Sequence, residues 1–382
     1  MSGGAAADVL IVGGGVIGCA IAHNLAKQGA RVTIVERRRL GQEASWASAG
    51  LVAPPGSPTT PAGRAELERR SFLLYPALVE ELRETTGLSV EYVRSGELSV
   101  ALDDAGVAAL RRALEWQEAH GFEVEWLEGD EARRRAPVLS PAVRGALWCP
   151  AAASLRAHRL TATLARAARL RGATILEETP VLGLLAAGAR VAGVHTAGGD
   201  LHAEQVLLAA GAWTAQLGAL AGVALPTRPV RGQMLAVAGP DDGPPLQPII
   251  AGAGGYLVPR ADGAVAVGAT VDEGGFDVRV TPDGLTWLAG LLRALAPALT
   301  GARVVETWAG LRPGSGDGQP ILGRAPGYEN LWVATGHFRS GVLWAPITGE
   351  LLAASIRTGQ PDPALAPFDP ARFAPALSPI GR

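Results

Sequence analysis

The sequence predicts an α/β protein in which a Rossmann-like nucleotide-binding domain, assembled from discontinuous segments, is joined to a second domain with a largely antiparallel sheet. An apolar run at residues 9–12 precedes a glycine-rich turn and a helical pattern, which is typical of a parallel strand covered on both faces. Similar apolar runs ending in glycine return at 206–211 and 331–336. Because these runs are far apart in sequence, we expect the intervening strand patterns to form the second domain.

Residues 8–36 form the clearest local unit. After the first strand, Ile17, Ile21 and Leu25 recur at helical spacing, which predicts one apolar helix face. A second short apolar strand then ends at Glu36. The segment is therefore predicted to be a βαβ unit.

The remaining elements follow from the same periodicities. Helices are predicted at residues 64–86, 104–120, 161–171, 282–295 and 342–357. Strands are predicted at residues 87–102, 174–178, 181–186, 191–196 and 226–270. The segment 48–64 is rich in Gly, Pro and Ala and is predicted to be a loop. The helix after it should expose one charged face, made of Glu66, Glu68, Arg69 and Arg70.

The order of these elements divides the chain into two domains, because a chain of 382 residues is long for one. We assign the nucleotide-binding domain to residues 1–86, 151–225 and 311–382. The substrate domain is assigned to residues 87–150 and 226–310.

Composition excludes several classes of function. Hydrophobic residues make up 48% of the chain and charged residues 18%, with a net charge of −2. This balance is typical of a globular enzyme and argues against nucleic acid or an anionic membrane as the main partner. The only two cysteines, Cys19 and Cys149, cannot form a disulfide framework, and Cys and His show no metal-site spacing. We expect a cytoplasmic protein with no membrane span and no metal.

The turn after the first strand carries Gly13, Gly15 and Gly18 in the dinucleotide fingerprint spacing. The first glycine allows the tight turn, the second lets the backbone approach a pyrophosphate, and the third lets helix and strand pack closely. Free N–H groups at the helix N-terminus would then bind phosphate oxygens. Glu36 ends the second strand, where a carboxylate can accept hydrogen bonds from ribose hydroxyls. This unit alone does not distinguish NAD from FAD.

Four motifs, of which the glycine turn is the first, indicate a family. They are Val-Gly-Gly-Gly-Val-Ile-Gly at 12–18, Ala-Ser-Ala-Gly at 47–50, Trp-Ala-Gly-Leu-Arg-Pro at 308–313 followed by Asp317-Gly318, and Gly-His-Phe-Arg-Ser-Gly at 336–341. In content and order they resemble the glycine, D-amino-acid and sarcosine oxidase family of FAD enzymes, over nearly the whole chain. Within it, the glycine oxidases of thiamine biosynthesis are the most similar group.

The resemblance implies FAD and a set of residues that hold it. The residues matched to the cofactor site are Gly13, Gly15, Val16, Ile17, Gly18, Glu36 and Arg37 for the ADP half, Ala44, Ser45, Ala49, Gly50 and Leu51 near the pyrophosphate, Val181 at the adenine, and His337, Phe338, Arg339, Ser340, Gly341, Val342 and Leu343 along the flavin ring. Relatives that bond flavin covalently use a cysteine in the C-terminal part of the chain. None lies beyond Cys149, so we expect noncovalent FAD.

Three residues match the substrate site of the family. Arg312 matches the arginine that binds the substrate carboxylate, a role that suits the two parallel N–H groups of a guanidinium; the alternative is a surface arginine in a Gly/Pro loop. Tyr256 matches the tyrosine that reaches the same carboxylate, and by itself would be a core aromatic. Arg339 matches the position whose backbone carbonyl receives the substrate amine.

The chain departs from the family at Trp46, Leu51 and Val271, where a small polar residue and two methionines are expected. The resemblance places these positions near the active site, where they would affect the size of substrate that fits.

No catalytic base is evident. The histidines His23, His120, His195 and His202 lie outside the matched motifs, and His337 is implied to position or tune the flavin. We therefore predict direct hydride transfer from the amine Cα to flavin N5, in which alignment supplies most of the catalysis. The products would be an imine or glyoxylate, ammonia and hydrogen peroxide.

Oxygen is the predicted electron acceptor and a small amino acid, with glycine first, the predicted substrate. If the pathway resemblance holds, a thiazole synthase receives the imine, and we expect a homo-oligomer. Two alternatives stay open: a D-amino-acid or sarcosine dehydrogenase with a non-oxygen acceptor, and a non-catalytic flavin-binding subunit of a heteromeric dehydrogenase. An NAD-binding module is a third class and would be colourless.

Overall fold

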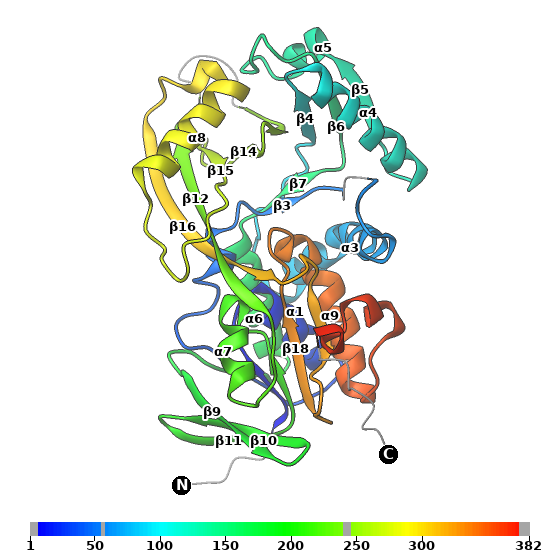
Figure 1. The fold of residues 1–382 in the computed structure, drawn as a ribbon, viewed down its shortest axis with the longest axis vertical. Coiled ribbons are helices and arrows are strands. Elements are labelled where there is room, and N and C mark those ends of the chain that lie inside the picture. The colour runs from blue at the N-terminus through cyan, green and yellow to red at the C-terminus, as the bar shows by residue number, and fades with distance from the viewer. Residues whose placement is uncertain (1–6, 55–57, 240–245, 374–382) are drawn as a thin grey trace, which may run out of the picture.

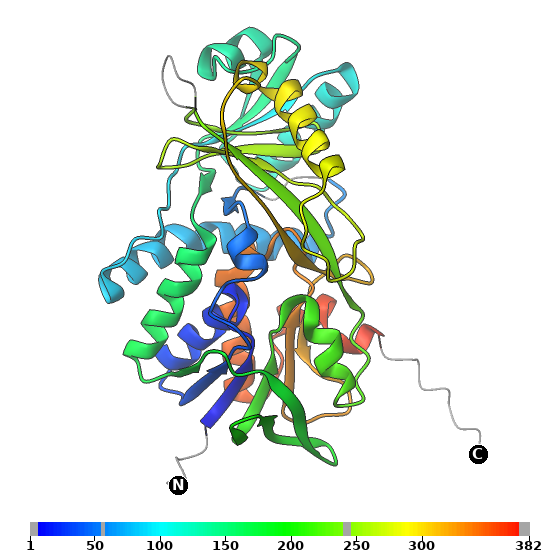
Figure 2. The same cartoon turned by 90° about the vertical axis from the view of Figure 1, so that its left-hand side faces the viewer.

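The computed structural model describes residues 7–54, 58–239 and 246–373. The described chain forms two lobes along the longest axis (Figure 1). The lower lobe contains the first sheet and both ends of the described chain, and the upper lobe contains the second sheet (Figures 1 and 2). Two long strands, β12 and β16, run from the upper lobe toward the lower one.

The first sheet brings together strands from the start, middle and end of the chain, as predicted. Its order is β17 (Ile321–Arg324), β18 (Leu331–Thr335), β11 (Gly199–Leu208), β1 (Ala7–Val12), β2 (Val32–Val35) and β8 (Thr174–Leu176). All neighbours pair in parallel except β17 and β18. The strands β9 (Val181–Ala187) and β10 (Arg190–Thr196) extend β11 as an antiparallel ribbon.

Both faces of this sheet are covered, which explains the continuous apolar run of β1. Val9 and Ile11 face a core cluster with α1 (Val16–Lys27), α6 (Ala157–Leu170) and α9 (Gly341–Thr358). Leu10 and Val12 face the opposite cluster, which includes residues of β10. Burying one such side chain contributes roughly 1.5–3 kcal/mol, so this strand anchors the lobe.

The second sheet is antiparallel except for one pair. Its order is β16 (Val304–Ser315), β12 (Thr227–Val237), β15 (Val265–Gly268), β14 (Gly255–Pro259), β13 (Ile249–Gly252), β4 (Glu97–Ala101), β6 (Gly145–Cys149) and β5 (Glu125–Glu128). Only β13 and β4 pair in parallel. The sequence therefore predicted the fold class correctly.

The two faces of the second sheet have different environments. Leu98, Ile250 and Leu257 pack into a core with Leu288 and Leu292 of α8 (Pro282–Leu295). The other face carries a smaller cluster to which Ala49 of the first lobe belongs. This second face is where the two lobes meet.

The other elements connect or brace the two lobes. They are α2 (Ala44–Ala47), β3 (Leu51–Val52), which pairs with β7 (Ala153–Ser154), α3 (Ala62–Thr86), α4 (Asp104–Ala119), α5 (Gly129–Arg135), α7 (Thr214–Ala219) and the 3₁₀ turns Gly211–Trp213, Pro297–Leu299, Pro363–Phe368 and Pro370–Phe373. The predicted loop at 48–64 is thus interrupted by β3 and ends early, where α3 begins.

One charged residue of α3 was predicted wrongly. Glu68, expected on the solvated face, is only 4% exposed. Its Oε1 accepts hydrogen bonds from Arg64 Nε at 2.9 Å and from Trp344 Nε1 at 2.9 Å. These partners satisfy the buried carboxylate. Arg64 lies on α3 itself, whereas Trp344 comes from α9, which the local pattern of α3 does not reveal.

The strands from residues 1–86, 151–225 and 311–382 lie largely in the first sheet, and those from the other segments lie largely in the second. The limit drawn between 310 and 311 falls inside β16. The domain limits themselves stay a prediction.

Candidate active site

A cavity of about 510 Å³ lies between the carboxyl ends of the first sheet and the second sheet. One end is lined by Glu36 and Val181, and the other by Tyr256 and Arg312. Ligands of open α/β sheets bind at the carboxyl ends of the strands, so the position of the cavity agrees with the fold.

The glycine turn has the close approaches that its spacing predicted. Gly13 has φ +118°, and a Cβ there would lie 2.4 Å from the carbonyl oxygen of Ala209. A Cβ on Gly18 would lie 2.1 Å from the carbonyl oxygen of Gly13. Gly15 is the N-cap of α1, with no side-chain cap bond, and lines the cavity. The backbone of Gly13 and Gly15 therefore lines the cavity at the start of α1 with no side chain of its own.

Glu36 is held with its carboxylate at the turn. Its Oε2 accepts from Gly14 N at 2.7 Å, and its Oε1 accepts from Arg38 N at 3.0 Å. Each carboxylate oxygen keeps a further lone pair, so the group can still accept hydrogen bonds from a ligand.

The helix N-terminus differs from the sequence expectation at one N–H group. Val16 N donates to the hydroxyl oxygen of Ser45 at 2.9 Å, so this N–H is not free for a phosphate. Ser45 lies on α2 and is 8% exposed. The contact ties the 44–47 turn to the glycine turn.

Sequence reasoning missed one aromatic residue at the nucleotide end. Trp213 lines the cavity, and the guanidinium carbon of Arg37 lies 3.7 Å from the centroid of its ring. Arg37 also pairs with Glu43. Because Trp213 follows β11 closely, the carboxyl-end rule for parallel strands would have found it.

The opposite end is built from the second sheet. Arg312 on β16 pairs in register with Val230 on β12, and its guanidinium lies across Gly232, where a Cβ would come within 2.2 Å of Nη2. Arg312 Nη1 donates to the carbonyl oxygen of Thr270 at 2.9 Å. Within the described part of the chain no carboxylate forms an ion pair with Arg312.

Arg312 is therefore a partly buried cation without a protein anion. Burial lowers its pKa while the neighbouring Tyr256 hydroxyl opposes that shift, but a guanidinium stays protonated in proteins. A buried charge is stable only with a partner. The arrangement suits an anionic ligand, and Tyr256, which also lines the cavity, adds a hydroxyl beside it.

The segment 337–342 closes the cavity between the two ends. Phe338 has φ +49°, which non-glycine residues seldom adopt, and its N–H donates to the carbonyl oxygen of Pro313 at 3.0 Å. This bond fixes the segment beside Arg312. Gly341 and Val342, in the first turn of α9, line the cavity, so the positive end of the helix dipole points there.

Helix α3 braces this turn, which the sequence did not indicate. The hydroxyl of Ser71 donates to the carbonyl oxygen of Leu343 at 2.6 Å, and the hydroxyl of Tyr75 donates to that of Val342. Burial, with a smaller contribution from Arg64, lowers the pKa of His337 to about 3. His337 is therefore neutral at ordinary pH and is not a cationic group of the site.

The structure brings most of the predicted site residues to one cavity. The predicted residues that line it are Gly13, Gly15, Val16, Ile17, Glu36, Arg37, Ala44, Ser45, Ala49, Gly50, Leu51, Val181, Tyr256, Arg312, His337, Phe338, Arg339, Gly341 and Val342. Gly18, Ser340 and Leu343 do not line it. Gly18 instead serves helix packing, and Leu343 is buried in the core.

Two of the three departures from the family lie away from the cavity wall. Trp46 is 42% exposed and packs edge-on against Trp308, and Val271 is 52% exposed. Leu51 does line the cavity. Of the three, Leu51 is the one placed to affect a ligand directly.

The described segments contain no group of three or more His, Cys, Asp or Glu residues placed to hold a metal ion. Among their helices, none is both long and apolar enough to cross a membrane.

The cavity joins a glycine turn with the dinucleotide spacing to a partly buried guanidinium, and comparison with known proteins gives the family. Residues 8–355 match the model of the DAO family, described as FAD dependent oxidoreductase. The chain belongs to this family, and it is an FAD-dependent oxidoreductase.

Within this family, the chain is similar to several individual proteins over nearly its whole length. The chain is 37% identical to glycine oxidase of Pseudomonas aeruginosa over 96% of this chain and 98% of the relative. The crystal structure of glycine oxidase from Geobacillus kaustophilus is similar with a TM-score of 0.90 and 37% identity, over 97% of this chain and 99% of that one. The bifunctional protein ThiO/ThiG of Trichormus variabilis is 37% identical over 96% of this chain and 55% of its own length.

The cavity fits FAD. The bare glycine turn and the N-terminus of α1 suit a pyrophosphate, and the fixed carboxylate of Glu36 suits a ribose. The N-terminus of α9 lies toward the other end, where the flavin ring would meet Arg312 and Tyr256. Neither cysteine lines the cavity, and noncovalent attachment stays a prediction.

Proposed function

We propose that this protein oxidises glycine, and with it sarcosine or small D-amino acids, to the imine, with FAD as cofactor and oxygen as electron acceptor. The observation that carries the proposal is Arg312, a partly buried guanidinium without a carboxylate partner among the described residues, at the far end of the dinucleotide cavity. The names of the relatives in Pseudomonas aeruginosa and Geobacillus kaustophilus support the choice of glycine.

Arg312 binds the substrate carboxylate. Its Nη1 already donates to the carbonyl oxygen of Thr270, which fixes the plane of the guanidinium. The remaining N–H groups can form two parallel hydrogen bonds with a carboxylate. Two such bonds set the orientation of a small amino acid as well as its position.

Tyr256 and Arg339 complete the substrate end. Tyr256 lines the cavity, and its hydroxyl lies 3.8 Å from the sulfur of Met234, a weak acceptor. A substrate carboxylate would therefore be a better partner for this hydroxyl. The side chain of Arg339 is exposed, so the proposed contact with the substrate amine uses its backbone carbonyl.

FAD, when bound, would supply the redox chemistry, as the acceptor of a hydride from the substrate Cα and the donor of two electrons to oxygen, which would give hydrogen peroxide. The chain supplies alignment, because it fixes the carboxylate and so the direction in which the Cα–H bond points. No residue of the described cavity wall needs to remove a proton, provided that the amine enters neutral. The imine then hydrolyses to glyoxylate and ammonia.

The test is an anaerobic titration of the purified protein with glycine. A yellow protein whose flavin absorbance bleaches with glycine and recovers in air, with formation of peroxide, supports the proposal. A yellow protein that glycine bleaches but air does not reoxidise would indicate a dehydrogenase, and one that no amine bleaches would indicate a non-catalytic subunit.

We further propose that a thiazole synthase takes the imine product. The bifunctional ThiO/ThiG relative supports this, because the part that matches this chain is about half of that protein. A homo-oligomeric state and a cytoplasmic location stay predictions.

A further inference from the structure

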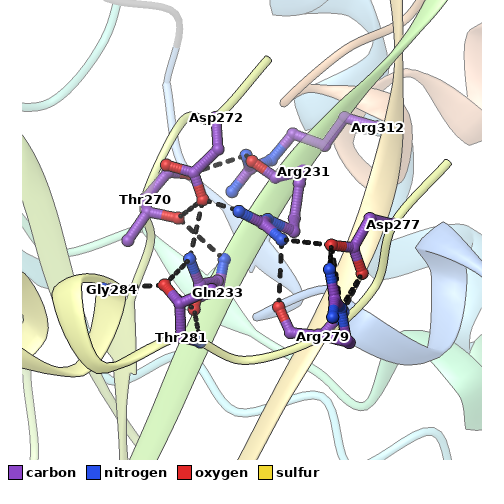
Figure 3. A network of polar contacts seen from close by, with 9 residues as sticks. All are labelled: Arg231, Gln233, Thr270, Asp272, Asp277, Arg279, Thr281, Gly284 and Arg312. Atoms are coloured by element: carbon purple, nitrogen blue, oxygen red, sulfur yellow. Dashed lines mark hydrogen bonds and ion pairs between the residues drawn. The ribbon is translucent and has the colours of Figure 1, made fainter. Parts of the chain in front are cut away.

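Arg312 is anchored by a backbone carbonyl that belongs to a polar cluster on and beside β12. The cluster comprises Arg231, Gln233, Thr270, Asp272 and Thr281 (Figure 3). None of these residues lines the cavity. Arg312 Nη1 donates to two carbonyl oxygens of the cluster, at 2.9 Å to that of Thr270 and at 3.5 Å to that of Arg231, so the contact with Thr270 is the closer one.

Asp272 lies at the centre of this cluster. Its Oδ2 accepts from Gln233 Nε2 at 2.8 Å, from the hydroxyl of Thr270 at 2.8 Å and from Arg231 Nε at 3.3 Å. Three donors on one carboxylate oxygen hold it in one orientation. Burial would raise the pKa of Asp272, but these hydrogen bonds outweigh it and leave the pKa below its ordinary value. Asp272 is therefore ionised at neutral pH.

The segment of Thr270 and Asp272 is also fixed through the backbone. Arg231 and Asp272 exchange two backbone hydrogen bonds of 2.9 Å, and Gln233 N donates to the hydroxyl of Thr270 at 3.0 Å. Thr270 is thus held on both sides: by the strand through Gln233 and by the carboxylate through its own hydroxyl.

Gln233 connects the cluster to the start of α8. Its Oε1 accepts from Thr281 N at 2.7 Å, and Thr281 is the N-cap that accepts from Gly284 N at 3.2 Å. A Cβ on Gly284 would lie 2.3 Å from Gln233 Oε1. The amide therefore has little freedom to turn, and the helix supports the position of Asp272.

We propose that Asp272 is a positioning residue for Arg312: through the Thr270 hydroxyl and backbone it keeps the Thr270 carbonyl beside Nη1, so that the other guanidinium N–H groups face the substrate. The inference rests on the proposed function for the identity of the substrate. Asp272 thus orients Arg312 although its carboxylate does not line the cavity.

The matched test compares Asp272→Asn with Asp277→Asn. Asp277 lies in the same loop and pairs with Arg231 at 3.3 Å, but no hydrogen bond joins it to Thr270 within the described residues. Binding of sodium acetate, a carboxylate without an amine, is measured from the change in the flavin spectrum of the holoenzyme. The Kd for glycine and the limiting rate of anaerobic reduction are measured in the same variants.

In Asp272→Asn we expect the Kd of acetate and of glycine to rise about 10-fold, with a smaller change in the limiting rate. In Asp277→Asn we expect both Kd values within about twofold of wild type. The double variant Asp272→Asn/Arg312→Ala should bind acetate no more weakly than Arg312→Ala alone, because Asp272 acts through Arg312. Equal effects of the two Asn variants, or additive effects in the double variant, would overturn the proposal.

Thr270→Val gives a second variant in case Asp272→Asn folds poorly. It removes the hydroxyl that reaches Asp272 and keeps the carbonyl, so a rise in the acetate Kd in the same direction is expected, and an unchanged Kd counts against the proposal. The two proposals fail separately. If glycine does not bleach wild type the substrate assignment fails, whereas unchanged acetate binding in Asp272→Asn and Thr270→Val removes only the role of Asp272.

Discussion

The two ends of the cavity are built in different ways. The glycine turn and Glu36 of the nucleotide end come from one short stretch of chain, and Gly13 and Glu36 are held by contacts with neighbouring elements. The substrate end consists of side chains from separate strands, and Arg312 is held by a carbonyl from residue 270. A change at the first end should therefore affect cofactor affinity, and a change at the second should affect substrate binding and alignment.

The largest effect is expected at the substrate end, from Arg312→Ala. Loss of a charged partner of the carboxylate should lower kcat/KM for glycine by about 100-fold or more. KM should rise, and kcat should also fall because the Cα–H bond is no longer aligned. Steady-state kinetics on FAD-loaded enzyme give both values. Arg312→Lys keeps the charge without the planar guanidinium, so its kcat/KM should lie between that of wild type and that of Arg312→Ala.

A second change at the same end leaves every polar group in place. Gly232→Ala puts a Cβ within 2.2 Å of the Arg312 guanidinium, so Arg312 must move. We expect the KM for glycine to rise about 10-fold, as for loss of one good hydrogen bond. Gly290→Ala on α8 is the control, since a Cβ there meets no atom within 4 Å. Similar KM values for the two variants would show that the clash is relieved without moving Arg312.

A change at the nucleotide end should weaken the binding of FAD and leave the binding of glycine unchanged. Glu36→Ala removes the carboxylate that Gly14 N and Arg38 N hold in place. The Kd for FAD should rise about 10-fold, measured by fluorescence titration of apoprotein. With FAD at saturation, the Kd for glycine should stay within about twofold of wild type. A large change in glycine binding would mean that the two ends are not independent.

The local character of the nucleotide end explains why the sequence predicted it well. The βαβ unit needs only the spacing of its glycines and apolar residues, and β1, α1 and β2 lie where that pattern put them. Helix α8 likewise has the predicted limits, because Thr281 caps it and its apolar face is regular. The roles of the individual site residues stay predictions until they are measured.

Contacts between distant elements were not predictable in the same way. Glu68 was placed in solvent because the pattern of α3 does not reveal that Trp344 of α9 packs against it. The roles of Gly232 and Asp272 depend on register across β12, which no motif encodes. Arg312 itself was found only through a family motif, since its isolated sequence context also fits a surface loop.

The last predicted effect concerns the stability of the fold and neither end of the cavity. Burial lowers the pKa of His23 to about 4, although Glu81 opposes the shift. The pKa of an unfolded histidine is roughly 6.5, so between these two pKa values the unfolded state binds more protons than the folded state. The contribution of neutral His23 to the free energy of unfolding is therefore complete above about pH 6.5 and is lost as the pH drops toward 4.

Urea unfolding at pH 8 and pH 5 measures this effect. The free energy of unfolding should fall by about 2 kcal/mol on account of His23, and His23→Gln should lose that part of the pH dependence. His202→Gln, at an exposed position, should keep it. Equal slopes in His23→Gln and wild type would contradict the assignment.

The most direct test of the whole account compares glycine with methylamine, the same amine without the carboxylate, in anaerobic reduction of the holoenzyme. If Arg312 aligns the substrate through its carboxylate, glycine should bleach the flavin rapidly and methylamine should not do so at the same concentration. Equal bleaching by both amines, or bleaching by neither, would contradict the account.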